Sequence, residues 1–184
     1  MSTATGEAAR SAATGDTVTG EAGTLREAFG QYATGVAVVT AAARGGERAG
    51  VTVNSFTSVS LDPPLVLWCL ARRSAALPVF LAAGRFAVNV LAEDQEHLSR
   101  RFAAPLPDRF AGVEAPPGPG GAPVLAGALA HFACRTVAVH RGGDHLILVG
   151  QVEHFRRWEG EPLIFHAGRY RRAASPEPLP VRCA

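Results

Sequence analysis

One stretch of this sequence, residues 50–71, constrains the fold and the chemistry of the chain more than any other. It reads GVTVNSFTSVSLDPPLVLWCLA, a segment rich in short polar side chains followed by an Asp-Pro-Pro turn and an almost wholly apolar strand. A strand that serves only a core would carry Val, Ile and Leu on its inner face. So many short hydrogen-bonding groups indicate a surface that meets a polar, flat or phosphorylated ligand at close range. The polar side chains are Thr52, Asn54, Ser55, Thr57, Ser58 and Ser60.

The size and charge of the chain narrow the possible classes of protein. Its 184 residues suffice for one domain that buries roughly two-thirds of the unfolded surface. A hydrophobic content of 47% and a charged content of 18% are typical of compact globular proteins. The net charge is only +2, and the arginines are scattered rather than gathered into a stripe. A nucleic-acid groove needs such a stripe, so we expect no nucleic-acid partner.

Cysteine usage and the lack of long apolar runs bear on location. The three cysteines Cys69, Cys134 and Cys183 are odd in number and show no CxxC spacing, which disfavours a disulfide framework or a zinc site. A reducing cytosol fits this pattern. The start of the sequence does not have the pattern of a signal peptide, and no apolar run approaches the roughly 20 residues of a membrane span. We therefore expect a cytoplasmic protein that does not enter a membrane.

The two ends of the chain differ in composition from its middle. Residues 1–23 are rich in Ala, Thr, Gly and Ser and hold few large apolar side chains, so we expect a flexible N-terminal tail. Residues 173–184 repeat proline and are expected to form a flexible C-terminal tail. The folded domain is therefore predicted to span residues 24–172.

Within this domain the pattern is mostly that of strands. Helical spacing predicts a helix over residues 24–33 with Thr24 as its N-cap, and glycine-rich turns at 44–47 and 141–144 predict two hairpins. A long Pro/Gly loop covers residues 103–122, and its 116–121 part is expected to be a mobile flap. The strands are expected at residues 35–40, 49–60, 65–70, 86–91, 130–140, 146–155 and 163–166, with further helices at 74–83 and 93–102. Many short strands and few helices favour a β-barrel.

Several catalytic motifs are missing from the sequence. It has no GxGxxG after a strand, no GxxxxGK[ST], no GxSxG, no HExxH and no His/Cys cluster at metal-ligand spacing. It also has no lysine, which excludes a P-loop and a Schiff base. An enzyme with so few reactive side chains would take its chemistry from a cofactor, and no metal is expected.

Several short segments, in their order along the chain, resemble a known family. They are residues 50–71, 86–91, 95–102, 108–112 (DRFAG), 127–130 (GALA), 143–145 (GDH) with 149–150, 162–163, and 168–170 (GRY). Together they resemble the short-chain flavin reductases of two-component flavin-dependent monooxygenases. The resemblance spans about residues 25–170, nearly the whole folded region.

This resemblance implies a fold, cofactors and partners. The fold is the FMN-binding split β-barrel, mainly β with a few helices and Greek-key-like, in a homodimer. The implied activity is that of an NAD(P)H:flavin oxidoreductase, which reduces FMN or FAD with NADH or NADPH. The reduced flavin then passes, by transient or diffusive coupling, to a separate monooxygenase or halogenase.

The resemblance also implies site residues. His145 would lie near the nicotinamide, as the residue closest to a catalytic role. The flavin site would draw on Ala49, Gly50, Val51, Thr52, Asn54, Ser55, Cys69, Leu70, Ala71, Ala75 and Ala76, closed by Gly168, Arg169 and Tyr170. Ala75 and Ala76 replace polar residues that often contact the phosphate, so backbone N–H groups, Ser74, or Arg72 and Arg73 are left as alternatives for that contact.

Other interpretations of the same residues remain open at this stage. The polar strand could be an exposed edge strand facing water, and His145 a solvated turn residue. Cys69 is expected to act as a small apolar side chain rather than a reactive thiol, and Trp68 to face the core or a dimer interface. Alternative functions are a split-barrel flavoprotein that keeps its flavin and acts on another substrate, a non-catalytic flavin-binding protein, or a β-barrel interaction module without a ligand.

Overall fold

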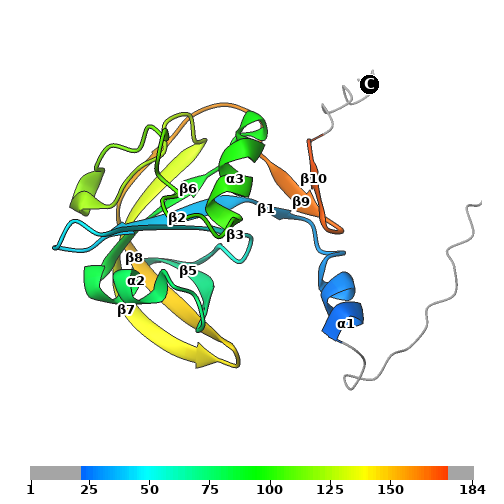
Figure 1. Cartoon of the computed structure of the whole chain (residues 1–184), viewed down its shortest axis with the longest axis horizontal. Coiled ribbons are helices and arrows are strands. Elements are labelled where there is room, and N and C mark those ends of the chain that lie inside the picture. Colours follow the sequence, from blue (N-terminus) through cyan, green and yellow to red (C-terminus); the bar gives the residue numbers. More distant parts are fainter. Residues whose placement is uncertain (1–21, 174–184) are drawn as a thin grey trace, which may run out of the picture.

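The structure is a computed structural model that describes residues 22–173, and its strands form two antiparallel sheets (Figure 1). The larger sheet has seven strands in the order β3-β2-β6-β7-β8-β5-β4, and the smaller has the order β1-β9-β10. The main-sheet strands are β2 (Ala37–Ala42), β3 (Arg48–Val53), β4 (Thr57–Leu61), β5 (Pro64–Ala71), β6 (Arg85–Val90), β7 (Ala130–Gly142) and β8 (His145–Arg157). The small-sheet strands are β1 (Thr34–Gly35), β9 (Ile164–His166) and β10 (Arg169–Arg171).

The helices are short. The α-helices are α1 (Ala22–Phe29), α2 (Leu77–Ala83) and α3 (Glu96–Ala103), with 3₁₀ turns η1 (Glu93–Gln95) and η2 (Pro119–Gly121). Helix α1 begins two residues before its predicted start, so Thr24 lies inside the helix and the predicted N-cap is wrong. Beyond Ala22, Gly23 and Ala173, both predicted tails lie outside the described residues. None of the described helices is long and apolar enough to span a bilayer.

Two hairpins set the registers that position the site. The turn at residues 44–47 joins β2 to β3, with Val39 opposite Val51, and the turn at 143–144 joins the long strands β7 and β8, as predicted. Strand β5 pairs with β8 so that Ala71 lies opposite His145. The mainly-β, antiparallel fold predicted from the sequence is therefore confirmed.

The single strand predicted over residues 49–60 is wrong, because the chain bends at residues 54–56. Strand β3 before the bend pairs with β2, whereas β4 after it pairs with β5 at the other edge of the sheet order. Within the bend, the Ser55 hydroxyl accepts a hydrogen bond from the Cys69 N–H at 2.9 Å. A side chain that bonds to backbone in this way competes with continued strand pairing. The bend carries Asn54 and Ser55 away from both ladders.

The interior of the barrel is filled by alternate residues of the strands. On β5, Val66, Trp68 and Leu70 are buried, whereas the residues between them are only half-buried. The Trp68 ring contacts Phe80 and Phe86 edge-on, with centroid distances of 4.9 and 5.6 Å. Trp68 therefore belongs to the core, one of the two places expected for it. We call this cluster the barrel core.

A second apolar cluster packs helix α3 against Val38 of β2 and Val36 just before that strand. Leu98 and Phe102 of α3 face inward, as predicted, and Phe102 packs edge-on against Phe110 at 5.1 Å. Gly50 lies directly beneath the Phe102 ring, so a Cβ at this position would collide with it. Glycine is therefore needed where α3 comes closest to the sheet.

The long loop after α3, residues 104–129, is tied to the barrel by buried side chains. Asn89 accepts a hydrogen bond from the Leu125 N–H at 2.9 Å, and Gln95 donates to the Ala126 carbonyl at 2.8 Å. Leu125 itself is fully buried. Because these amides satisfy loop backbone groups inside the protein, this half of the loop has a fixed position.

The 116–121 segment differs from the free flap expected from its Pro and Gly content. The Gly118 N–H donates to the Ala122 carbonyl at 2.8 Å, and the Val124 N–H donates to the Pro116 carbonyl at 2.9 Å. These bonds close the segment on itself next to the buried residues 122 and 123. Proline and glycine here serve a tight turn rather than a flap.

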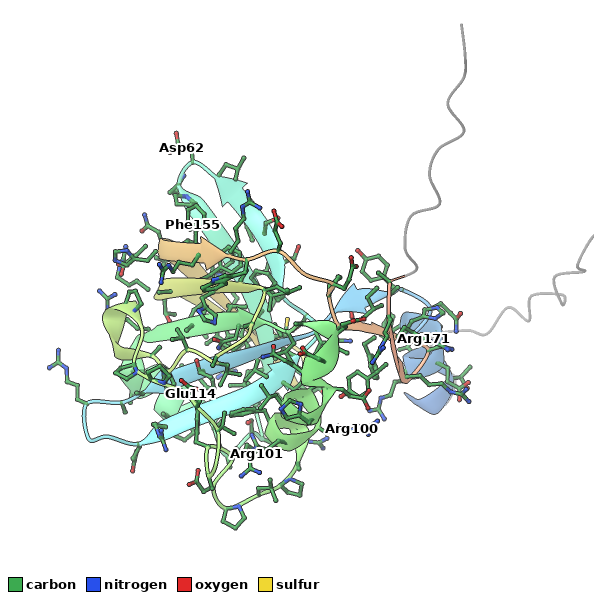
Figure 2. The ribbon with its side chains drawn as sticks, turned by 90° about the horizontal axis from the view of Figure 1, so that it is seen from above. Asp62, Arg100, Arg101, Glu114, Phe155 and Arg171 are labelled. Atoms are coloured by element: carbon green, nitrogen blue, oxygen red, sulfur yellow. The ribbon has the colours of Figure 1, made fainter. Side chains whose placement is uncertain are left out.

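Helix α1 and the small sheet stand beside the barrel rather than on it (Figures 1 and 2). On α1 and the turn after it, Leu25, Phe29 and Tyr32 are 43%, 70% and 79% exposed. The spacing of four residues puts Leu25 and Phe29 on one side of α1, and Tyr32 follows in the turn after the helix. We call these three residues the α1 face.

Candidate functional site

A cavity of about 370 Å³ opens where β3 and the bend after it face the last residues of β5. Helix α3 and the loop after it close one side, and the start of β8 closes another. The lining residues are Val51, Thr52, Val53, Asn54, Ser55, Cys69, Leu70, Ala71, Ser74, Phe102, Ala103, Arg109 and His145. Eight of the sequence-predicted site residues meet in this cavity, although they come from three separate segments of the chain.

The β3 wall of the cavity is polar and held in place by hydrogen bonds. The Thr52 hydroxyl donates to the Ser99 carbonyl of α3 at 2.6 Å, which fixes that side chain against the helix. Ser55 accepts from the Cys69 N–H, which ties the bend to β5. Asn54 is exposed and makes no side-chain bond among the described residues, so its amide is free to meet a ligand.

Only part of the polar segment faces this cavity. Strand β4 forms the edge of the sheet order, and its residues are mostly exposed. An edge strand facing water was one of the interpretations left open, and it holds for this half of the segment. The residues concerned are Thr57, Ser58 and Ser60, none of which lines the cavity.

His145 lies at the opposite wall, at the first position of β8. Its Nδ1 is 2.8 Å from Asp144 Oδ1, and its side chain is 43% exposed. The hydrogen bond from the His145 ring lowers the pKa of the Asp144 carboxyl, and the charge of a protonated ring lowers it further. The Asp144 carbonyl accepts from the Arg72 N–H at 2.9 Å, which fixes the turn. This arrangement sets the direction of the imidazole and leaves Nε2 without a partner among the described residues.

The segment after β5 presents fewer groups to the cavity than the sequence suggested. Of the residues considered for a phosphate contact, only Ser74 lines the cavity. Its hydroxyl also accepts from the Ala76 N–H at 3.3 Å. Ala75 and Ala76 do not line it, and Arg72 and Arg73 are exposed outside it.

Arg109 is a lining residue that the sequence analysis did not select. Its Nε donates to the Ala104 carbonyl at 2.9 Å and its Nη1 to the Gly50 carbonyl at 2.8 Å. It lies in the Asp-Arg-Phe segment that contributed to the family resemblance, which was the signal available. Val53, Phe102 and Ala103 were also missed, because their place in the cavity depends on how α3 crosses β3.

A second cavity of about 230 Å³ adjoins the first and shares four residues with it. The Tyr170 hydroxyl lies 2.8 Å from Ser99 Oγ, and the Arg100 guanidinium lies 4.9 Å from the centre of the Tyr170 ring. Ser99 thus joins Thr52, through its carbonyl, to Tyr170, through its hydroxyl. The lining residues are Val36, Thr52, Val53, Asn54, Ser99, Ala103, Phe165 and Tyr170.

The remaining predicted site residues lie elsewhere. Gly168, with a φ of +74°, forms the β9–β10 turn and lines a third cavity of about 830 Å³ beside α1. Asn54 also lines this cavity, so it belongs to all three. Arg169 is exposed and lines none of them, Ala49 faces the barrel core, and Gly50 lies under Phe102.

The chemistry of the cavity fits a flavin. Hydroxyl and amide groups line one wall and apolar Val and Leu side chains the floor, which suits a flat ring system with polar edges. Among residues 22–173, the lining side chains that can carry charge are Arg109, His145 and the thiol of Cys69, and none of the carboxylates of these residues lines the cavity. No cluster of three potential metal ligands occurs within residues 22–173.

The barrel, the α3 crossing and this cavity define a flavin reductase-like domain. The family model described as "Flavin reductase like domain" matches residues 29–174, and the chain belongs to this family. The chain is 50% identical over 131 residues to a "Probable flavin reductase" of Rhizobium meliloti, covering 71% of the chain and 42% of that protein. The chain spans about half the length of the first curated relatives it matches.

The chain is also similar to a monooxygenase reductase subunit and to a flavin oxidoreductase of solved structure. The reductase subunit HsaB of a flavin-dependent monooxygenase from Mycobacterium tuberculosis is 39% identical over 150 residues, with 80% of each chain covered. The NADH:FAD oxidoreductase SgcE6 of Streptomyces globisporus, solved with NAD and FAD fragments, is 44% identical with a TM-score of 0.78. That alignment covers 82% of this chain and 91% of the other.

Proposed function

We propose that this protein is an NAD(P)H:flavin oxidoreductase, which reduces FMN or FAD by hydride transfer. The observation that carries the proposal is the cavity in which the polar β3 wall faces His145 across the end of β5. The family supports it, as do relatives named as flavin reductases. When both are bound, nicotinamide supplies the hydride and flavin accepts it, so the protein's task is to hold two ring systems in contact.

Each wall of the cavity has a proposed part in this task. Asn54, Ser55 and the backbone of β3 would hydrogen-bond the polar edge of the flavin ring, where negative charge develops on reduction. Cys69, Leu70 and Ala71 would form the apolar surface beneath it. Stacking of the two rings at about 3–3.5 Å supplies much of the acceleration in such a reaction.

His145 would contact the nicotinamide rather than act as an acid or a base. Its hydrogen bond to Asp144 holds the ring in one orientation, with Nδ1–H directed to the carboxylate. Hydride transfer needs no proton from the protein, so an oriented imidazole serves binding and alignment. Tyr170, held by its bond to Ser99, would close the site from the adjoining cavity on the β3 side.

The proposal includes a homodimer. The α1 face exposes three large apolar side chains, and α1 has only eight residues. Helices this short are marginal in water unless an apolar side is packed against another surface. A second copy of the chain would cover the α1 face and bound the open cavity beside Asn54.

The proposed destination of the reduced flavin is a separate monooxygenase or halogenase, reached by transient or diffusive coupling. The name of the relative HsaB, a reductase subunit, supports this role. A cytoplasmic location belongs to the same proposal, because unpaired cysteines suit a reducing compartment.

The test is NADH and NADPH oxidation by the purified full chain with and without added FMN or FAD. We expect a colourless protein whose activity requires free flavin. A yellow protein that oxidises neither nicotinamide with either flavin would contradict the proposal and favour a flavin-binding or flavin-storing role. A yellow protein active without added flavin would indicate a tightly bound prosthetic group instead.

A further inference from the structure

We propose that a groove at the end of β8 binds a planar aromatic carboxylate, in a site separate from the flavin cavity. The groove has a volume of about 400 Å³ and lies between the start of β7, the end of β8 and the 116–126 part of the long loop. We call it the β7–β8 groove. Among the described residues, none lines both this groove and the cavity beside His145.

The position of the β7–β8 groove keeps it apart from the other proposed contacts. His145 begins β8, and the lining residue Phe155 is ten residues further along the same strand, which corresponds to roughly 30 Å. Phe155 and α1 lie at opposite ends of the molecule (Figure 2). A ligand in the groove would therefore meet neither the flavin nor the second copy that we expect on the α1 face.

The walls of the groove offer flat apolar surfaces to a ring. The Trp158 side chain is 47% exposed, and the His131 ring packs edge-on against it with the ring centres 5.0 Å apart. Prolines of the 116–119 segment line the groove from the loop, and the bond from the Gly118 N–H to the Ala122 carbonyl fixes that segment. Flat proline and aromatic faces favour each other in such grooves, and the volume is within the range of small-molecule sites.

Arg156 gives the groove a positive charge that is not neutralised. It lies opposite His131 in the β7–β8 ladder, and its guanidinium carbon is 5.9 Å from the centre of the Trp158 ring. Arg156 is in none of the ion pairs within residues 22–173, and none of the carboxylates in this range lines the groove. The groove therefore favours a ligand whose ring stacks on Trp158 and whose carboxylate bonds to Arg156.

The two histidines of the groove add hydrogen-bonding groups. Burial lowers the pKa of His131, the bond to the Leu125 carbonyl opposes this, and the charge of Arg156 lowers the pKa again. The ring is thus neutral at pH 7, and its Nε2–H donates to the Leu125 carbonyl at 2.8 Å, which holds the loop beside Trp158. His154 lies two residues before Arg156 and is exposed in the groove, where its ring N–H can donate to the same anion. One fixed charge with one such donor suits a single carboxylate.

The test compares 2-naphthoate with 2-naphthamide, which has the same rings but no charge. Binding to the full-length protein is measured by isothermal titration calorimetry at low salt, without FMN and with FMN in excess. We expect the Kd for 2-naphthoate to be about tenfold or more below that for 2-naphthamide, the effect of a hydrogen bond to a charged group. Because the two sites are separate, FMN should change the Kd for 2-naphthoate by less than about twofold.

Two substitutions separate the charge contact from the ring contact. Arg156→Gln should raise the Kd for 2-naphthoate to about that for 2-naphthamide and leave the amide within about twofold. Trp158→Ala should weaken both ligands by a similar factor of about fivefold, because it removes the stacking surface. The backbone N–H of residue 158 donates to the Leu129 carbonyl in either case, so the strand end keeps its place. Arg157→Gln removes an equal charge from the next residue, which does not line the groove, and leaves both values unchanged.

Other results would overturn the inference. Equal wild-type affinities for the acid and the amide would show that Arg156 meets no anion, and no binding of 2-naphthoate at about 1 mM would show that the groove holds no ring. Loss of 2-naphthoate binding on addition of FMN would place the anion in the flavin cavity instead. If a variant does not fold, the wild-type comparison of the two ligands and the FMN titration still decide. These outcomes leave the proposed function untouched, because binding is measured without catalysis.

Discussion

The barrel core and the α1 face hold similar side chains in opposite surroundings. In the core, Trp68, Phe80 and Phe86 are at most 2% exposed, and the two Phe rings each pack edge-on against Trp68. On the α1 face, Phe29 and Tyr32 are at least 70% exposed. The apolar side chains of the barrel core are thus buried by other residues of the same chain, whereas those of the α1 face are left exposed by the described residues. This difference is why we assign the α1 face to a contact between two copies.

The candidate site lies at the boundary between these two regions. Its β3 and β5 walls are backed by the barrel core, and Asn54 at its edge also borders the space beside α1. Buried strands give the walls a fixed geometry.

The largest expected effect tests the barrel core. Phe86→Ala removes a buried ring that contacts Trp68 and should lower the free energy of unfolding by about 3–5 kcal/mol. The exposed Phe155, on the outer surface of β8 (Figure 2), is the matched control, and Phe155→Ala should cost about 1 kcal/mol or less. Urea denaturation followed by circular dichroism measures both. Equal losses would refute the contrast between interior and surface.

The next prediction tests the α1 face. Phe29→Glu places a charge where we expect a second copy to pack, so the dimer should dissociate while the circular dichroism spectrum stays that of a folded protein. Light scattering after size-exclusion chromatography measures the mass. Leu81→Glu makes the same change at a half-exposed position of α2 and should leave the dimer intact. A wild-type monomer would remove the homodimer from the proposal.

A smaller expected effect is a difference between the rates at which Cys69 and Cys134 react with an alkylating reagent. Burial raises the pKa of the Cys134 thiol to about 12, with a further contribution from the charge of Glu153. Because the thiolate is the reactive form, iodoacetamide near pH 8 should leave Cys134 unmodified in the native protein. Cys69 lines the cavity and should react faster, and added FMN should slow it. Peptide mass spectrometry distinguishes the sites; rapid native labelling of Cys134 would contradict its burial.

Much of the fold was predictable because local signals and tertiary packing agree. The glycine-rich turns at 44–47 and 143–144 flank alternating apolar strands, so the hairpins follow from the sequence alone. The inward faces of α3 and β5 follow from periodicity for the same reason. The bend at residues 54–56 could not be predicted from local signals, because it depends on a hydrogen bond between Ser55 and Cys69, which is fourteen residues away.

The site residues that lie on β3 and β5 could be predicted. Those that reach the cavity only because α3 crosses β3 could not. Thr52, Asn54, Cys69 and Ala71 line the cavity as expected. Arg109 and Phe102 reach it only because α3 packs over Gly50, a contact between distant segments. The family resemblance supplied the expectation for Cys69, Ala71 and His145, since the apolar strand and the ordinary turn that hold them indicate no ligand by themselves.

The most direct test of the central claim is the steady-state kinetics of His145→Ala, with NADH and FMN varied independently. If the cavity brings nicotinamide and flavin together beside His145, the KM for NADH should rise about tenfold, equivalent to about 1.4 kcal/mol. The KM for FMN should change less than about twofold, because the β3 wall is untouched. An unchanged KM for NADH, in a folded variant that still binds FMN, would contradict this account of the site.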